Sequence, residues 1–336
     1  MNQLLWKKIG LRLATLVGIL FTLTILLFVL EEISGFDPAA VKVGANASPE
    51  AIQAERERMG LNDPILVRYV RYIGGVVQGD LGTSYRTVHA ITDDIAMYLP
   101  ASIEIVGFAF VLAVLGASFF AISSQLRWPG TSLVRGAMFV AYTTPGFLLA
   151  LFGILLFYRT WKVFPASGRI SDPDALNGPT GFFTIDALLA GRPDLFADVV
   201  SHLVLPGIAL AAIPAVAIGR VLRSSLSQTI TSDYIRTAQM KGLSEWRVLT
   251  RHVVRNSLPA TLSMLGLQVG FMFSGLIVVE KVFSYPGIGL YMANALGVAD
   301  FPAISGGTLV LGTIYVVSNT VVDFLQSAAD PRVELA

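Results

Sequence analysis

Residues 257–279 read SLPATLSMLGLQVGFMFSGLIVV, a run of 23 residues without Asp, Glu, Lys or Arg. A helix that crosses the hydrocarbon core needs roughly 20 apolar residues, so this run is long enough for one crossing. Five further uncharged runs have similar lengths: 13–30, 105–126, 136–158, 203–219 and 301–322. Only 14% of the 336 residues are charged, against about 25% in a soluble domain. The sequence therefore predicts an all-α integral membrane protein with six transmembrane helices, and excludes a soluble enzyme, a nucleic-acid-binding domain and a disordered chain.

The charge distribution predicts the orientation of the chain. The N-terminus, the loop between the second and third runs, residues 220–258 and the C-terminal tail together carry 13 basic and five acidic residues. The segments on the opposite side carry 11 basic and 17 acidic residues. Lys and Arg are enriched on the cytoplasmic side of membrane proteins. We therefore expect a multi-pass protein of the lipid bilayer with both termini and residues 220–258 in the cytoplasm, and its net charge of +1 provides no field that would attract nucleic acid.

Three parts follow from the spacing of the runs. Residues 1–30 form the cytoplasmic N-terminus and transmembrane helix 1, which we expect to be retained because its 18-residue apolar run exceeds the roughly 7–15 residues of a signal peptide. Residues 31–100 form an extracytoplasmic segment. Residues 101–336 form a core with transmembrane helices 2–6 and the cytoplasmic loop 220–258.

Helix start and stop signals occur within the extracytoplasmic parts. Ser48-Pro49-Glu50 is typical of a helix start and Gly60 of the end of that helix. Asn62-Asp63-Pro64 predicts the start of a second helix, and Gly79-Asp80-Leu81-Gly82 predicts a turn. The segment after the third run is loop-like, with a short helix expected near 183–189.

The most informative polar stretch is residues 232–246, SDYIRTAQMKGLSEW. Ser232 or Asp233 can cap a first helix, and Gly242 can adopt the left-handed conformation that ends it. Ser244 can cap a second helix. The stretch therefore predicts two short helices that meet at a glycine bend and lead into the fifth span.

Each short helix carries a stripe of residues at helical spacing. The first stripe consists of Tyr234, Thr237, Ala238 and Lys241, and the second of Trp246, Leu249 and Val253. Such a pair forms a stiff lever at the membrane surface, with Trp246 packing the lever and the small side chain of Ala238 allowing another protein to dock closely. The residues alone support equally well a basic loop that satisfies the positive-inside bias or lies on anionic lipid.

The stretch Tyr-Ile-Arg-Thr-Ala-Gln-Met-Lys-Gly-Leu, residues 234–243, resembles the EAA loop of ABC importer permeases, in the form typical of the dipeptide/oligopeptide branch. Four further motifs are similar to that family and occur in its order: MGLNDP (59–64) with GDLGTS (79–84), Thr144-Pro145, EKVFSYPGIG (280–289), and Asn319 and Asp323 followed by Asp330-Pro331-Arg332. Two features depart from the general EAA pattern: Arg236 replaces a Glu, and Pro259 lies farther from the glycine.

The resemblance implies a type I ABC importer permease in a bacterial inner (plasma) membrane, with an extracytoplasmic insertion after helix 1. It implies four kinds of partner besides lipid: a second homologous permease, two ABC ATPase subunits that carry ATP and Mg, an extracytoplasmic binding protein, and the peptides which that protein delivers. The chain itself would be a transport subunit rather than an enzyme, without cofactor, metal or catalytic residues. Nickel chelates, glutathione and other small solutes are alternative cargoes within the same class.

The resemblance and the residue pattern together select the candidate site residues. The expected ATPase-coupling interface consists of Tyr234, Arg236, Thr237, Ala238, Lys241, Gly242 and Trp246. Gly266 and Gly270 form a small-residue face for helix packing. Candidate residues lining the transport pathway are Thr143, Thr144, Gln268 and Asn319. A stand-alone carrier or channel is the alternative function, although ion-driven carriers usually keep an ionisable residue at membrane depth and the six runs contain no Asp, Glu, Lys or Arg.

Overall fold

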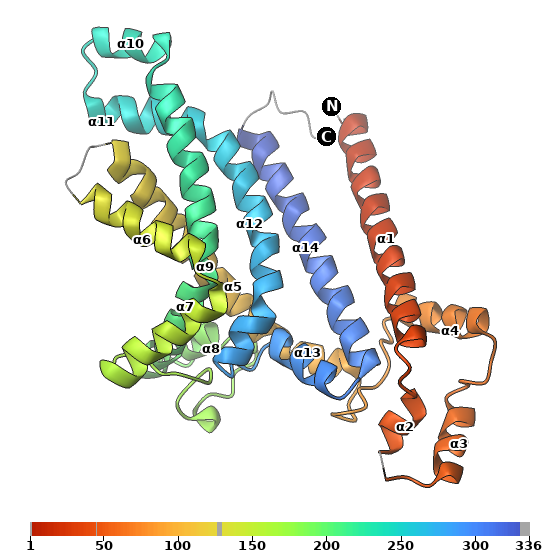
Figure 1. Ribbon diagram of the computed structural model, residues 1–336. Helices are drawn as coiled ribbons and strands as arrows, with labels where there is room; N and C mark the ends of the chain where they lie inside the picture. The colour runs from red at the N-terminus through yellow and green to blue at the C-terminus, as the bar shows by residue number, and fades with distance from the viewer. Residues whose placement is uncertain (1, 45, 126–129, 330–336) are drawn as a thin grey trace. The chain divides into compact units, whose positions relative to one another are not determined.

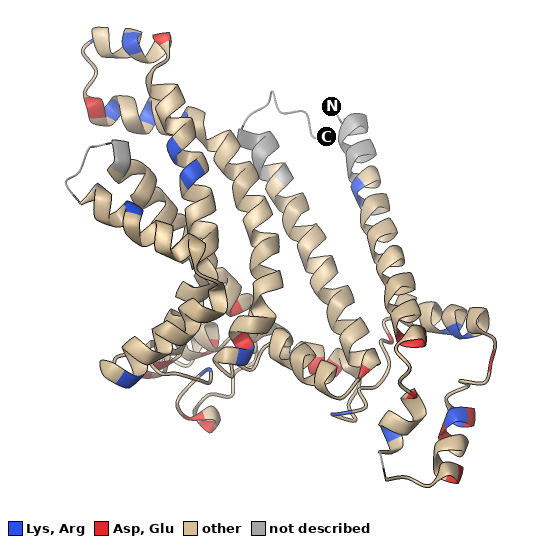
Figure 2. Ribbon diagram, in the orientation of Figure 1, with Lys and Arg blue, Asp and Glu red and all other residues tan. Residues whose placement is uncertain are grey.

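The structure is a computed structural model that describes residues 2–44, 46–125 and 130–329, and these residues form helices joined by loops (Figure 1). Charged residues gather near the helix ends and in the connecting segments, and the middle parts of the long helices are largely free of them (Figure 2). The chain divides into two compact units, residues 1–102 with 286–316 and residues 103–285 with 317–336. The predicted motif Asp330-Pro331-Arg332 and the side chain of Asp323 lie outside the described residues.

Unit 1 contains the first four helices of the chain, the helix α13, and the beginnings of two longer helices. Its complete helices are α1 (Asn2–Ile33), α2 (Pro38–Val43), α3 (Pro49–Arg58), α4 (Ile65–Val77) and α13 (Ile288–Gly297). Two long helices begin in unit 1 and end in unit 2, namely α5 (Ile91–Gln125) and α14 (Phe301–Ala329). The remaining α-helices of unit 2 are α6 (Thr131–Thr143), α7 (Gly146–Gly153), α8 (Phe183–Leu189), α9 (Pro193–Ile230), α10 (Asp233–Met240), α11 (Glu245–Val248) and α12 (Arg255–Val282). Two π-helical segments, Ile154–Thr160 and Leu249–Val254, and a 3-10 helix, Pro173–Ala175, also belong to this unit.

The start and stop signals within residues 31–100 are confirmed. Ser48 caps α3, because its hydroxyl accepts a hydrogen bond from the Ala51 amide at 3.3 Å. Gly60 follows that helix with φ +65°, the left-handed conformation expected of a helix end. Helix α4 begins directly after Pro64, as predicted.

The core of unit 1 surrounds the short helix α13. Ile91, Ile288 and Tyr291 are fully or almost fully buried in it. Asp300 is also buried, and its carboxylate accepts hydrogen bonds from the Ser84 hydroxyl at 2.6 Å, the Arg86 amide at 3.1 Å and the Ala303 amide at 3.3 Å. The same side chain therefore caps α14 and fixes the loop that precedes α5, a role that the sequence did not indicate for Ser84 or Asp300.

Five of the six predicted spans are single helices that are long and apolar enough to cross a membrane: residues 10–33, 91–123, 193–230, 245–282 and 301–322. The fourth span, which contains Pro206 and Pro214, is continuous through both prolines as the central part of α9. Prolines are tolerated inside such helices when neighbouring helices satisfy the freed carbonyl groups.

The third predicted span, residues 136–158, is not one straight helix. Helices α6 and α7 meet at an angle of 116°, with Thr144 and Pro145 at the break. Proline has no amide hydrogen and disfavours helical conformation at the residue before it, and Thr144 is accordingly extended, with ψ 127°. The third predicted span is therefore a bent helix pair, which makes six spans if the pair crosses as one, and the Thr144-Pro145 motif is the physical cause of the bend.

Glycines allow the helices of unit 2 to approach closely. A Cβ atom added at Gly219 of α9 would lie 3.0 Å from the Phe120 ring of α5 and 3.3 Å from Ala117. One added at Gly266 of α12 would lie 2.7 Å from a methyl group of Val322 on α14. The prediction that Gly266 serves helix packing is thus consistent with its surroundings, and Gly270, one turn further on, is buried as well.

We predict that Gly266→Ala destabilises the protein, because the new methyl group must displace Val322. Overpacking of this kind costs about 1–3 kcal/mol. The matched control is Gly107→Ala in α5, where an added Cβ meets no atom within 4 Å. Thermal unfolding of the purified protein in detergent should show a lower midpoint for Gly266→Ala than for Gly107→Ala, and equal midpoints would contradict the proposed packing.

Candidate functional site

The loop between α9 and α12 forms two short helices, as predicted. Helix α10 ends just before Gly242, whose φ of +76° lies in the left-handed region, and α11 follows. Ser232 and Ser244 hold the predicted N-cap positions, but neither side chain makes the capping hydrogen bond. Ser232 instead donates to the Thr229 carbonyl at 2.6 Å, which ties the start of α10 to the end of α9. We call residues 231–254 the elbow.

A buried apolar cluster makes the elbow rigid. Its members come from α5, α9, α10, α11 and the π-helical segment 249–254: Ala121, Leu222, Leu226, Ile235, Ala238, Val248, Leu249 and Val253. At the base of the elbow, the Ser257 hydroxyl lies 3.2 Å from Thr229 Oγ1 and joins α12 to α9. The elbow is therefore fixed to the helices of unit 2 by packing and hydrogen bonds, so that a displacement of one is transmitted to the other.

The structure corrects the expected positions of two elbow residues. Ala238 is only 8% exposed and packs inside the elbow's own cluster, so it does not present a surface for docking. Trp246 is 67% exposed and does not pack the lever, a role that falls to Val248. The physical reason is that two short helices must bury their own apolar side chains to hold together, and Ile235 and Ala238 share the inward face.

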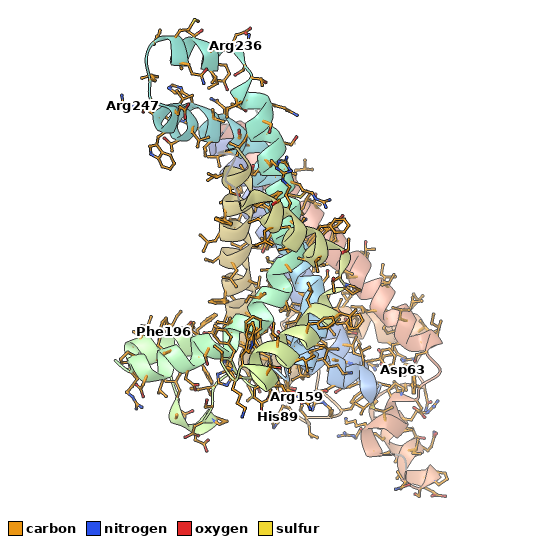
Figure 3. The ribbon with its side chains drawn as sticks, turned by 60° about the vertical axis from the view of Figure 1, so that its left-hand side comes forward. Asp63, His89, Arg159, Phe196, Arg236 and Arg247 are labelled. Atoms are coloured by element: carbon orange, nitrogen blue, oxygen red, sulfur yellow. The ribbon has the colours of Figure 1, made fainter. Side chains whose placement is uncertain are left out.

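The outer surface of the elbow combines large apolar side chains with cations. Tyr234 is half-exposed, Trp246 is largely exposed, and Met240, which the sequence did not single out, is 81% exposed. Arg236 and Arg247 lie at this end of unit 2, and Arg159 and Phe196 at the other (Figure 3). Thr237, Lys241 and Gly242 are also exposed, so six of the seven predicted coupling residues lie on the surface: Tyr234, Arg236, Thr237, Lys241, Gly242 and Trp246.

A hollow of about 390 Å³ opens beside Trp246 on the elbow. Its walls are formed by Ile230, Gln239, Glu245, Trp246, Val248, Leu249 and Val253. Arg236 makes a long, exposed ion pair with Asp233, at 3.9 Å, and such surface pairs contribute little. The surface therefore offers an apolar hollow, an aromatic rim and weakly engaged cations, which suits contact with another protein.

A second cavity, of about 550 Å³, lies among the membrane-spanning helices of unit 2. Residues of α6, α7, α9 and α12 line it, and Gln268 and Tyr142 are among its polar side chains. The guanidinium group of Arg220 lies 4.1 Å from the centre of the Tyr142 ring. The cavity is thus mainly apolar, with a few polar groups that can contact a solute.

Of the four candidate pathway residues, only Gln268 lines this cavity. The Thr143 hydroxyl donates to the Phe139 carbonyl of its own helix at 2.9 Å. Thr144 forms the break between α6 and α7, and Asn319 lies on α14. The neighbouring residues Tyr142 and Gly146 line the cavity in place of the two threonines.

A buried ion pair, which sequence reasoning missed, fixes the loop before α8. Arg169 donates from Nε and Nη2 to one oxygen of Glu104, at 3.0 and 2.7 Å. The other oxygen accepts from the amide and hydroxyl of Thr184, at 2.7 and 2.6 Å. The guanidinium group also lies 3.8 Å from the centre of the Phe183 ring and donates to the Gly181 carbonyl. The one signal in the sequence was Glu104, an isolated acidic residue directly before the uncharged run 105–126.

Tyr285 is buried close to this ion pair. Burial, and secondarily the negative charge of Glu104, raise the pKa of the Tyr285 phenol far above its usual value, so the group is neutral. The network as a whole therefore contains one paired charge of each sign, with each carboxylate oxygen hydrogen-bonded. Helix α8, which this network holds, matches the helix expected near residues 183–189.

These features define the class of the protein: a polytopic membrane protein with a cavity among its helices and a rigid elbow at one end of unit 2. The family described as the inner membrane component of binding-protein-dependent transport systems matches residues 109–335, and its N-terminal counterpart matches residues 5–106. The chain belongs to this family, and it is a transport subunit rather than an enzyme.

Relatives cover almost the whole chain. The dipeptide transport system permease protein DppB of Alkalihalophilus pseudofirmus is 38% identical over 326 residues, which are 96% of this chain and 98% of that protein. The probable D,D-dipeptide transport system permease protein DdpB of Escherichia coli is 33% identical over 332 residues, 98% of this chain and 97% of that protein. The di/tripeptide transport system permease protein DppB of Pseudomonas aeruginosa is 35% identical over 326 residues, 96% of this chain and 97% of that protein.

We predict that Arg169→Met lowers the stability of the protein, because it leaves the Glu104 carboxylate buried without a counter-charge. Breaking one side of a buried ion pair costs about 3–5 kcal/mol. The double variant Glu104→Gln/Arg169→Met should recover much of the loss, because no buried charge remains.

The control is Arg192→Met, which breaks an ion pair with Asp194 whose two side chains are 54% and 59% exposed. Exposed pairs contribute at most about 1 kcal/mol. Thermal unfolding in detergent is the measurement, and a midpoint for Arg169→Met no lower than that of Arg192→Met would show that the network does not stabilise the fold.

Proposed function

We propose that this chain is the membrane-spanning permease subunit of an ATP-driven ABC importer, and that it forms a path for peptides together with a second, homologous permease. The near full-length similarity to permease subunits named for dipeptide and tripeptide transport carries the proposal. The cavity among α6, α7, α9 and α12 supports it, because its apolar wall and few polar groups suit a solute that moves through rather than one held tightly.

The elbow receives the driving force in this proposal. Two ATPase subunits, which would carry ATP and Mg, contact Tyr234, Arg236 and Trp246 from the cytoplasm. When the ATPases close, each elbow moves as a unit, because its buried cluster ties it to α5 and α9. The movement reaches the cavity through α9 and α12, since both helices extend from the elbow into the cavity wall. Gly242 and Ala238 set the shape of the elbow, and the exposed residues make the contact.

The remaining partners follow from the same proposal. An extracytoplasmic binding protein delivers the peptide, both termini lie in the cytoplasm, and the chain is a multi-pass protein of the bacterial inner membrane. The seven basic residues between 220 and 255 support this orientation, because Lys and Arg favour the cytoplasmic side. A stand-alone carrier is disfavoured by the cavity, whose described lining contains no Asp, Glu, Lys, Arg or His to couple transport to an ion.

Reconstitution tests the function directly. The complete transporter in liposomes should take up a labelled dipeptide only when ATP and the binding protein are present. Liposomes that contain this chain alone should show no uptake. Flux of the dipeptide through the chain alone would establish a carrier instead, and an active complex that ignores peptides but carries a nickel chelate or glutathione would change the assigned cargo.

We predict that Gly242→Val uncouples ATP hydrolysis from import. An added Cβ meets no atom within 4 Å, so the cost comes from the backbone alone, at φ +76°, and a side chain in this conformation costs about 1–2 kcal/mol. Gly242→Asn is the matched control, because Asn tolerates the left-handed region. Peptide uptake per ATP hydrolysed, measured at equal membrane levels, should fall for the Val variant and stay near wild type for the Asn variant. A Val variant with wild-type coupling would contradict the role of the bend.

A further inference from the structure

Helix α4 exposes a continuous apolar sector, although it belongs to a segment that the sequence predicts to be extracytoplasmic. Leu66, Val70 and Val77 are 78%, 67% and 81% exposed. With 3.6 residues per turn, these three side chains point within about 40° of one another around the helix axis. An apolar patch of this kind on a water-exposed surface marks a site that something else covers.

The two flanks of this sector have different surroundings. On one flank, Tyr69 and Tyr72 face α1, and the Tyr69 ring lies 5.2 Å from that of Phe28 in an edge-to-face arrangement. On the other flank, Arg71 pairs with Asp63 on the surface. Helix α4 thus has a side that packs on a transmembrane helix, a bare apolar side next to it, and a polar side beyond that. This is the order expected of a helix that lies in the plane of a membrane surface.

The positions along α1 of the residues that α4 contacts indicate how deep α4 lies in the membrane. The Tyr69 hydroxyl lies 3.0 Å from the Thr24 hydroxyl, and Arg68 forms an ion pair with Glu32 at 2.5 Å. Thr24 lies six residues inside the end of the uncharged run 13–30, which corresponds to about 9 Å at 1.5 Å per residue. Helices that lie in a membrane interface bury their apolar face about 5–10 Å into the boundary of the acyl chains.

We propose that α4 is an interfacial helix, and that lipid acyl chains of the leaflet at the C-terminal end of α1 cover Leu66, Val70 and Val77. Helix α1 also exposes apolar side chains, since Leu26 and Val29 are about half-exposed. Tyr69 and Tyr72 lie at the level where tyrosines concentrate in membrane proteins. Helix α4 therefore anchors helices α2 and α3 to the membrane surface, in addition to the attachment that α1 provides.

This chain contains no cysteine, so each introduced cysteine is its one labelling site. Single cysteines replace Leu66, Val70 or Val77 in the complete transporter in liposomes, and each carries a nitroxide spin label. Arg71→Cys is the control within the same helix, and Ala54→Cys, on the exposed surface of α3, is a second control. The accessibility of each label to oxygen, which partitions into lipid, and to a water-soluble nickel chelate is measured by electron paramagnetic resonance.

We expect the labels at positions 66, 70 and 77 to be relaxed mainly by oxygen, and those at 71 and 54 mainly by the nickel chelate. Equal access of the nickel chelate to positions 70 and 71 would place α4 in water and overturn the proposal. Protection of position 70 from both reagents would show that a protein surface covers the sector, and would overturn it as well. Because these readouts do not involve transport, they are independent of the cargo.

Discussion

The interior of a bilayer contains no water, so each backbone amide and carbonyl that crosses it has to find its hydrogen-bond partner within the protein. This constraint explains why the long uncharged runs are helices, and why α9 remains helical through Pro206 and Pro214. It also explains the form of the break at Thr144-Pro145. The chain there turns sharply from one helix directly into another, at 116°, and so leaves very few backbone groups outside a helix.

The elbow shows how packing can connect a polar loop to the membrane-spanning helices. Its helices are too short to be stable alone, since isolated helices under about 12–15 residues are marginal in water. They persist because Ile235, Ala238 and Val248 are buried together with side chains of α5 and α9. The same packing that stabilises α10 therefore connects it to the membrane-spanning helices, and leaves Tyr234, Met240 and Trp246 outside for a partner.

Buried charges fasten the loops in both units. In unit 2 the Glu104–Arg169 pair holds the segment before α8, and in unit 1 Asp300 joins the start of α14 to the loop that contains Ser84. Each carboxylate is satisfied by several donors, which is the condition under which a buried charge is tolerated. The partners of Glu104 lie 65 and 80 residues away, and Ser84 lies 216 residues from Asp300.

The sequence was sufficient to predict the all-α class, the spans, the caps of α3 and the left-handed Gly242, because these depend on uncharged run length and on local conformational preference. It also contained the motifs of the permease family. Three features required the three-dimensional packing: Ala238 is buried and Trp246 exposed, Gln268 alone among the four candidates lines the cavity, and Arg169 pairs with Glu104. The orientation of a side chain and the partner of a charge depend on segments far apart in the chain, and spacing along one helix carries no information about them.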